Sequence, residues 1–230
     1  MGFSARTQRA TFPADRLLYY YVTDRKQLRG GNLLSCIGRA VVWGVDIVQI
    51  REKDLPDFEL YRLTRETVAI TRATGCKVIV NGRADVALSA GAQGVHLPSA
   101  GLKPSDIRPW VPDRFIIGVS VHSCSEALQA ESDGADYVLL GSIYPTPSKS
   151  GYGRPLGVAV LLETCKRIRL PVFGLGGIDA DRIKAVWAAG ASGVAAIRMF
   201  QENLAGLKRL NRAALRSTTP RAKGRSVSGG

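Results

Sequence analysis

The stretch that decides the fold runs from Ile116 to Lys149 and reads IIGVSVHSCSEALQAESDGADYVLLGSIYPTPSK. It begins with an apolar run, continues with a segment of helical character near Ser125 to Ser132, and returns to an apolar run at Asp136 to Gly141. Short apolar runs of this kind predict strands, and the longer segment between them predicts a helix. The stretch is therefore expected to form a strand, a helix and a second strand.

The same alternation of short apolar runs and longer amphipathic segments continues in both directions along the chain. The predicted strands are Leu17 to Thr23, Asp46 to Arg51, Lys77 to Asn81, Gly94 to Leu97, the run that begins at Ile116, Asp136 to Gly141, Pro171 to Leu175 and Gly193 to Ile197. The predicted helices are Asn32 to Trp43, Pro56 to Thr74, Ala84 to Ala90, one after Pro104, Ser125 to Ser132, Gly157 to Ile168, Asp179 to Ala189 and Asn203 to Leu215.

Eight such units over roughly 200 residues fit a closed (β/α)8 TIM barrel, an α/β fold, in a single domain. Most strands are apolar on both faces, as in a parallel sheet covered by helices. An open, doubly wound sheet is the alternative, but no GxGxxG motif follows the first strand. We assign residues 16–217 to the barrel, residues 1–15 to a flexible leader, and residues 218–230 to a disordered basic tail with little apolar content.

The composition, 45% hydrophobic and 22% charged, is that of an ordinary globular protein. The net charge is +13, but residues 201–230 alone hold seven basic side chains and one acidic one. The basic body suits an anionic metabolite, and the tail lacks the aromatic residues that stack on nucleic-acid bases.

No apolar run approaches the roughly 20 residues of a transmembrane helix, and no secretory signal is visible, so a cytoplasmic protein is expected. Four scattered cysteines without a CxxC motif predict neither a zinc site nor a redox pair.

Polar side chains at the strand ends are the first candidates for chemistry, because active sites of such barrels lie at the C-terminal ends of the strands. Gln49, Arg51 and Lys53 alternate at the end of the second strand and share one face. Three polar residues in phase are more than one salt bridge needs, so we interpret them as ligand contacts. Ion pairing with the neighbouring Glu52 or Asp54 is the alternative interpretation.

Two further strand ends carry groups suited to a phosphorylated small molecule. At the fifth strand, Ser120 and His122 share one face, and an imidazole near neutral pH suits proton abstraction from carbon. The alternative for the histidine is that it caps the next helix or that its ring is satisfied by a backbone group. The loop after the sixth strand offers Thr146, Ser148 and Lys149, which suit an anion.

The last two strand ends are candidates for a phosphate site. Gly176 and Gly177 follow the seventh strand, and Arg198 follows the eighth. In barrels of this kind a phosphate often rests on these loops, where glycine lets backbone N–H groups approach an anion. A solvent-exposed arginine without a ligand is the alternative for Arg198.

Six motifs occur in order along the chain: QIREK (Gln49 to Lys53), VNGRADVAL (Val80 to Leu88), GVHLPS (Gly94 to Ser99), GVSVHS (Gly118 to Ser123), ADYVLLGSIYPTPSK (Ala135 to Lys149) and GLGGI (Gly174 to Ile178). Together they resemble the thiamine phosphate synthase and TenI superfamily, over roughly residues 17–200. The resemblance implies a (β/α)8 barrel and a role in thiamine biosynthesis.

The resemblance also implies roles for individual residues. Positions that contact the pyrimidine substrate in synthases are matched by Gln49, Lys53, Asn81, Ser120 and Lys149. Positions of the thiazole phosphate site are matched by Thr146, Ser148, Gly177, Ile197 and Arg198. Arg198 stands where the family usually has a small residue.

The chain departs from the synthase branch at two positions. There, two aspartates hold the Mg²⁺ that binds a pyrimidine pyrophosphate, and here the matching residues are Gly82 and Gly101. Mg²⁺ needs hard oxygen ligands, so both protein ligands are lost. The NGR and HLPS segments are instead similar to the TenI branch, the thiazole tautomerases, which isomerise a carboxythiazole phosphate by proton transfer without metal. The PTPSK segment, in contrast, is similar to the PTxTK loop of the synthases.

Three functions are therefore weighed. The first is a metal-independent thiazole tautomerase with His122 as the base and no cofactor. The second is a thiamine phosphate synthase that uses Mg²⁺, with Asp85 or Asp106 compensating for the lost ligands. The third is a non-catalytic sensor of a phosphorylated ligand, assisted by the basic tail. The expected partner is a small phosphorylated thiazole, without a membrane or nucleic acid, and the oligomeric state stays open, a homodimer included.

Overall fold

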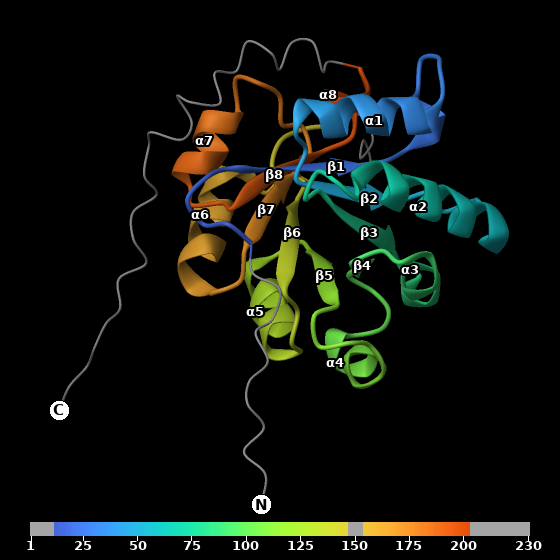
Figure 1. The fold of residues 1–230 in the computed structure, drawn as a ribbon. Coiled ribbons are helices and arrows are strands. Elements are labelled where there is room, and N and C mark those ends of the chain that lie inside the picture. The colour runs from blue at the N-terminus through green and yellow to red at the C-terminus, as the bar shows by residue number, and fades with distance from the viewer. Residues whose placement is uncertain (1–11, 147–153, 203–230) are drawn as a thin grey trace, which may run out of the picture.

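The computed structural model of the chain describes residues 12–146 and 154–202, in which strands and helices alternate (Figure 1). The strands are β1 (Leu18–Val22), β2 (Ile47–Ile50), β3 (Lys77–Asn81), β4 (Gly94–Leu97), β5 (Ile116–Val121), β6 (Tyr137–Gly141), β7 (Val172–Leu175) and β8 (Gly193–Ala196). The α-helices are α1 (Leu33–Trp43), α2 (Asp57–Thr71), α3 (Ala84–Ala90), α4 (Pro104–Ile107), α5 (Cys124–Ser132), α6 (Gly157–Arg167), α7 (Ile183–Ala188) and α8 (Arg198–Gln201). Two short 3-10 helices are η1 (Arg25–Gln27) and η2 (Arg108–Trp110).

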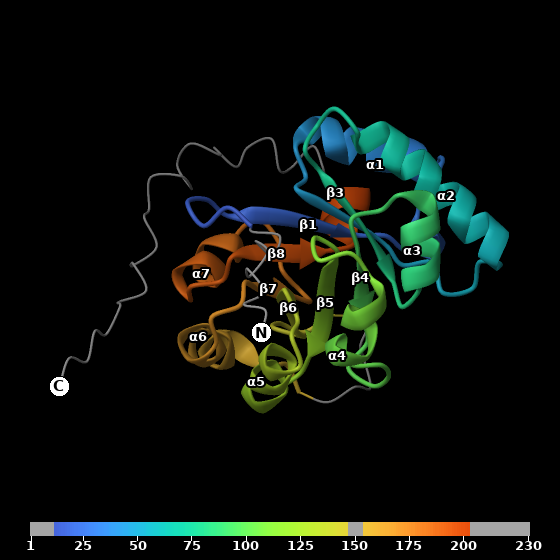
Figure 2. The ribbon, with the colours of Figure 1, turned by 60° about the horizontal axis from the view of Figure 1, so that its bottom comes forward.

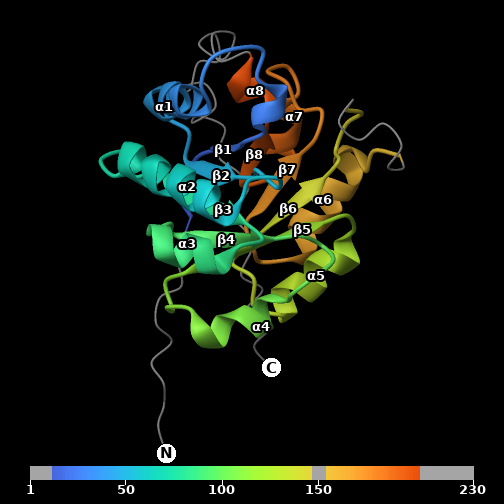
Figure 3. The ribbon, with the colours of Figure 1, turned by 90° about the vertical axis from the view of Figure 1, so that its right-hand side faces the viewer.

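The strands form a closed parallel barrel in the order of the sequence. Each strand pairs with the next, and β8 returns to pair with β1 along the register from Leu18 opposite Gly193 to Tyr21 opposite Ala196. Figures 2 and 3 show the helices around the outside of the strands. The predicted (β/α)8 barrel is therefore confirmed, and the C-terminal ends of all the strands meet at one rim, here called the mouth.

Side chains of the barrel pack in two separate apolar layers. The outer layer lies between the sheet and the helices and includes Val48, Val80 and Ile117. The inner layer fills the barrel itself and includes Tyr20, Tyr137 and Phe173. The alternation of side chains along each strand places neighbouring residues in different layers, which is why the strands are apolar on both faces.

Phe12 extends the inner layer, although the prediction placed it in the leader. Its ring lies edge-on to those of Tyr137 and Phe173, with centroids 5.7 and 5.8 Å apart. Residues 1–11 of the predicted leader and residues 218–230 of the predicted tail lie outside the described residues. Within the described part of the chain, no helix is both long enough and apolar enough to cross a membrane.

Two helices near the C-terminus differ from the prediction. Asp179 was expected to begin a helix, but its side chain accepts a hydrogen bond from the backbone N–H of Arg182 in a turn, and α7 begins at Ile183. Arg198 was expected at a strand end but is the first residue of α8. The predicted helix from Asn203 to Leu215 lies outside the described residues.

The mouth is held together where the first and last units meet. The side chain of Gln201 in α8 accepts a hydrogen bond from the backbone N–H of Asp24 and donates one to the backbone carbonyl oxygen of Asp24. The donor–acceptor distance is 3.0 Å in both bonds. Asp24 in turn caps η1 by accepting from the backbone N–H of Lys26. These contacts fix the loop after β1 next to α8.

Candidate active site

A cavity of about 1210 Å³ opens at the mouth of the barrel. It takes side chains from the ends of all the strands, as expected for a barrel of this kind. Its lining includes these predicted site residues: Gln49, Arg51, Lys53, Asn81, Ser120, His122, Thr146, Gly176, Gly177, Ile197 and Arg198. Ser148 and Lys149 lie outside the described residues. The structure thus brings together every predicted site residue that it describes.

The end of β2 is organised by Glu52, which is buried. Its carboxylate accepts hydrogen bonds from the hydroxyl of Thr23 over 2.7 Å and from the backbone N–H of Arg25 over 3.1 Å. The guanidinium of Arg25 also pairs with Glu52 over 3.1 Å and with Asp54 over 2.6 Å. Both acids are therefore occupied by Arg25 and are not the ion-pair partners of Arg51 and Lys53.

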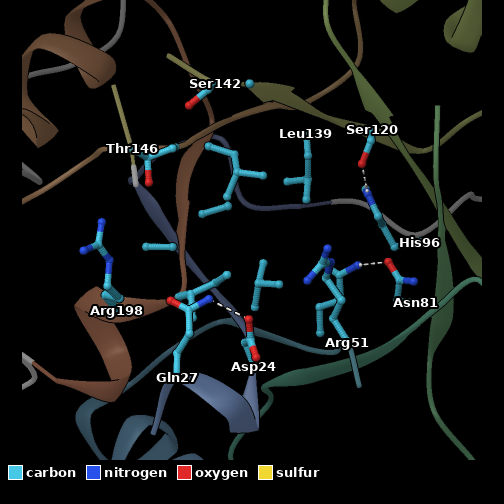
Figure 4. A pocket seen from close by; sticks show the side chains of 18 of the residues that line it. Asp24, Gln27, Arg51, Asn81, His96, Ser120, Leu139, Ser142, Thr146 and Arg198 are labelled. Atoms are coloured by element: carbon cyan, nitrogen blue, oxygen red, sulfur yellow. Dashed lines mark hydrogen bonds between the residues drawn. The ribbon is translucent and has the colours of Figure 1, made fainter. Parts of the chain in front are cut away.

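Three basic side chains on the lining keep their charge available for a ligand. In the part of the chain that the structure describes, no carboxylate lies within 4 Å of the charged groups of Arg51, Lys53 or Arg198. Figure 4 shows Arg51 on the same side of the cavity as Asn81 and His96, with Arg198 on the opposite side beside Thr146. The cavity can therefore hold negative charge at both ends.

Ser120 on β5 and His122, the residue directly after β5, reach the cavity with different partners. Ser123 caps α5 by accepting from the backbone N–H of Glu126, and the Glu126 carboxylate accepts from the backbone N–H of His122. These bonds fix the backbone of His122, whose Nδ1 lies 2.5 Å from the carbonyl oxygen of Gly141. A carbonyl only accepts, so Nδ1 carries the proton and Nε2 of the neutral ring is left as a base. Of the alternative roles for His122, capping belongs to Ser123, whereas a hydrogen bond to the backbone is present at Nδ1 through Gly141.

Ser120 pairs with His96, not with His122. Its hydroxyl lies 2.8 Å from Nε2 of His96, which also lines the cavity (Figure 4). Nδ1 of His96 lies 3.1 Å from the hydroxyl of Tyr137. Burial, followed by the charge of Arg51, lowers the pKa of His96 to about 3, so this imidazole is neutral at physiological pH.

The turn after β7 packs closely against the loop that follows β6. Gly177 has φ of 63°, and a side chain there would collide with the backbone of Pro145 and with Tyr144, so only glycine fits. Arg182 binds the carbonyl oxygen of Gly177, and its guanidinium lies 4.7 Å from the ring centre of Tyr144. This packing holds the turn beside Thr146 and Arg198 on the cavity lining.

The positions that hold Mg²⁺ in the synthase branch do not fit a metal ion here. Gly82 lines the cavity without a side chain, and Gly101 is not on the lining. Asp85 is paired with Arg83 over 2.7 Å, and Asp106 accepts from the backbone N–H of Lys103, so neither reaches the cavity to compensate. Among the described residues, no group of three or more His, Cys, Asp and Glu side chains is arranged to hold a metal ion.

The acidic residues on the lining are engaged elsewhere. Asp24 accepts from Lys26 and Gln27, and Glu52 binds Thr23 and Arg25. Asp179 pairs with Arg182 and Glu202 with Arg29, both over 3.6 Å. We therefore assign no metal-dependent step to these residues.

The lining residues that sequence reasoning missed include His96, Asp24 and Gln27. The signal for His96 was present, because it alternates with Gly94 on the inner face of β4 and lies in register with Gly118 of β5. Asp24 and Gln27 belong to the short η1 turn after β1, whose composition carries no sign of a ligand site.

Comparison with known proteins identifies the family. The family model described as thiamine monophosphate synthase matches residues 19–200. The chain belongs to this family. With the barrel and the cavity already established, membership of the thiamine monophosphate synthase family makes the chain an enzyme of thiamine biosynthesis.

Named relatives agree with this membership. A Geobacter sulfurreducens protein, provisionally named thiamine-phosphate synthase, is 44% identical over 77% of this chain and 84% of its own. The thiamine-phosphate synthase of Roseiflexus castenholzii is 38% identical over 84% of this chain and 85% of its own. A solved structure of thiamine phosphate pyrophosphorylase from Pyrococcus furiosus superposes with a TM-score of 0.73 and 31% identity, over 83% of this chain and 90% of that one.

Proposed function

We propose that the chain binds a carboxythiazole phosphate in the mouth of the barrel and isomerises it by proton transfer through His122. The observation that carries the proposal is the fixed imidazole of His122, whose Nδ1 lies 2.5 Å from the Gly141 carbonyl oxygen while the ring lines the cavity. A general base needs an unprotonated nitrogen at a defined place beside the substrate, and Nε2 of His122 meets that need. In the reaction a proton leaves one carbon of the unaromatised thiazole and one is returned to another carbon.

The charges of the cavity suit this substrate. A carboxythiazole phosphate carries one anionic group on the ring and another on its side chain. The cavity offers Arg51 and Lys53 at one end and Arg198 at the other, all free of carboxylate partners within the described residues. We place the phosphate on Gly176, Gly177, Ile197 and Arg198, which line the cavity together after β7 and β8.

The test is an isomerisation assay in EDTA. The unaromatised carboxythiazole phosphate is mixed with the protein, and aromatisation is followed by absorbance. We expect His122→Gln to lower the rate by about 100-fold or more, which is the usual contribution of a general base. Gln129→Ala, a change at an exposed position of α5, is the matched control and retains the wild-type rate. An inert wild-type protein, or a fully active His122→Gln variant, would end the proposal.

A second candidate is thiamine-phosphate synthesis, the transfer that joins a pyrimidine pyrophosphate to a thiazole phosphate. The names of the relatives favour it, and a cavity of about 1210 Å³ exceeds the roughly 300–1,000 Å³ usual for one small ligand. The glycine at position 82, in place of a metal-binding aspartate, counts against it. The same preparation should be assayed for pyrophosphate release at millimolar Mg²⁺, and release that EDTA abolishes would establish the synthase instead.

Other predictions remain proposals. We expect a cytoplasmic enzyme, supported by free cysteines at positions 36, 76, 124 and 165. Nucleic-acid binding and a sensor role through the tail concern residues outside the described part of the chain. A homodimer stays open to a measurement of the mass in solution.

A further inference from the structure

Four polar side chains form a continuous line through the interior of the barrel. The hydroxyl of Tyr20 lies 2.7 Å from that of Tyr137, which lies 3.1 Å from Nδ1 of His96. Nε2 of His96 lies 2.8 Å from the hydroxyl of Ser120 at the cavity. Tyr20, Tyr137 and His96 are at most 1% exposed. The line therefore runs from the closed interior to the ligand cavity.

Among the residues that the structure describes, the far end of the line offers no acceptor. Tyr20 lies in the inner layer, with the ring of Phe173 edge-on at 5.4 Å between centroids. Throughout residues 12–146 and 154–202, the one hydrogen-bond partner of the Tyr20 hydroxyl is the hydroxyl of Tyr137. The hydrogen of Tyr20 therefore has one place to go, the oxygen of Tyr137. A buried donor left unpaired is destabilising.

This end fixes the direction of every bond that follows. When Tyr20 donates to Tyr137, the hydrogen of Tyr137 is free to reach Nδ1 of His96. A neutral imidazole has one N–H, so Nδ1 accepts and Nε2 carries the proton, which is donated to the oxygen of Ser120. The opposite direction would run from Ser120 to Tyr20 and leave the Tyr20 hydrogen buried without an acceptor.

We propose that Tyr137 and His96 act as positioning residues that orient Ser120 as a hydrogen-bond donor to the ligand, with Tyr20 closing the far end of the line. Because the Ser120 oxygen already accepts from His96, its own hydrogen points toward the cavity. The ligand group at this point is therefore an acceptor, such as a carboxylate oxygen or an unprotonated ring nitrogen. The orientation is independent of which of the two reactions the enzyme catalyses.

The small size of Gly118 makes the line possible. Gly118 lies in register with Tyr137 on the neighbouring strand, and any side chain there would overlap the ring of Tyr137. The missing side chain gives this ring the space to reach His96, whose ring stacks on it at 5.7 Å between centroids. Gly118 and Ser120 alternate on the inner face of β5, so one strand supplies both the space and the end of the line.

The direct test is the tautomer of His96 in the full chain. The sequence holds two histidines, so a ¹⁵N-histidine-labelled sample at pH 7 gives two ring systems, which His122→Gln assigns. We expect Nε2–H for His96 and Nδ1–H for the neutral ring of His122. A His96 ring protonated at Nδ1 would overturn the proposal, whether or not the protein is an active isomerase.

Two variants test the source of the orientation. Tyr137→Phe keeps the ring and removes the hydroxyl that donates to His96, so the ¹⁵N signal of Nδ1 should move toward that of an unbonded, pyridine-type nitrogen. Tyr20→Phe should leave Nε2 protonated, because the closed end still offers no acceptor. An Nδ1 signal unchanged by Tyr137→Phe would refute the role of Tyr137.

The ligand side is tested by calorimetry with carboxythiazole phosphate, a probe chosen from the proposed function. Ser120→Ala should weaken its binding by at least about 10-fold, the cost of one hydrogen bond to a charged group. Equal binding by wild type and Ser120→Ala would refute donation by Ser120. If wild-type protein does not bind the probe while His96 shows Nε2–H, the proposed function fails and the orientation of Ser120 stands.

Discussion

The buried imidazole of His96 should make the stability of the protein depend on pH below neutrality. Its pKa in the folded state is about 3, because burial opposes the charged form, whereas an exposed histidine has a pKa of 6.5. Below pH 6.5 the unfolded chain therefore binds a proton that the folded chain excludes. The stabilising contribution is complete above pH 6.5 and is lost as the pH falls toward 3.

The size of the loss follows from the same two values. Each pH unit between them costs about 1.4 kcal/mol of unfolding free energy, so the loss between pH 7 and pH 5 is about 2 kcal/mol from this residue alone. Urea unfolding at pH 7, 6 and 5 measures the change. Because carboxylates also titrate, the informative quantity is the difference between wild type and His96→Gln, whose amide cannot take up a proton in this range.

His122→Gln is the matched control, because it removes the other histidine from the exposed rim. We expect His96→Gln to have a shallower pH dependence than His122→Gln by about 2 kcal/mol between pH 7 and pH 5. The free energy of unfolding of His96→Gln is also expected to be lower than that of wild type at every pH. That uniform decrease does not affect the comparison of the pH dependences. Parallel pH profiles for wild type and His96→Gln would show that the folded protein accommodates the charged ring, and the reasoning would be refuted.

Three further predictions concern packing, the rim and the ligand. Gly118→Ala places a methyl group against the ring of Tyr137 and should lower the free energy of unfolding in urea by about 1–3 kcal/mol, with Gly38→Ala, on α1, as a control without close contacts. Thr23→Val removes the hydroxyl that binds Glu52 and the backbone N–H of Arg51, and should cost about 1–3 kcal/mol in the same assay; an unchanged urea midpoint would contradict the role of this contact. Arg198→Met should weaken thiazole phosphate binding by at least about 10-fold in calorimetry, whereas Arg29→Met at an exposed position should not; equal affinities would remove Arg198 from the phosphate site.

Much of the barrel could be predicted because each strand corresponds to a short apolar run in the sequence. The run from Lys77 to Asn81, for example, is a strand with the predicted bounds, since its apolar residues are buried on both faces. The helix predicted at Asp179 begins later because a capping residue looks the same in a turn as at a helix start. Local pattern therefore identifies elements better than it identifies their ends.

The candidate residues lie together at the mouth because they follow the ends of predicted strands. Their hydrogen-bond and ion-pair partners could not be predicted. Phase along β5 placed Ser120 with His122, whereas the contact of Ser120 with His96 depends on the register between β4 and β5. The pairing of Arg25 with Glu52 likewise joins the loop after β1 to the end of β2. Such contacts between strands arise from the folded arrangement and leave no spacing rule in the sequence.

The return of β8 to β1 has a consequence for synthesis on the ribosome. Until the residues of β8 emerge, β1 and the most recent strand both present unpaired backbone groups, and such edges invite pairing with other chains. Gln201 secures the loop at Asp24 only after the last strand is in place. A nascent chain that stalls before Gly193 should therefore lack a finished ligand site and should depend on chaperones until translation resumes.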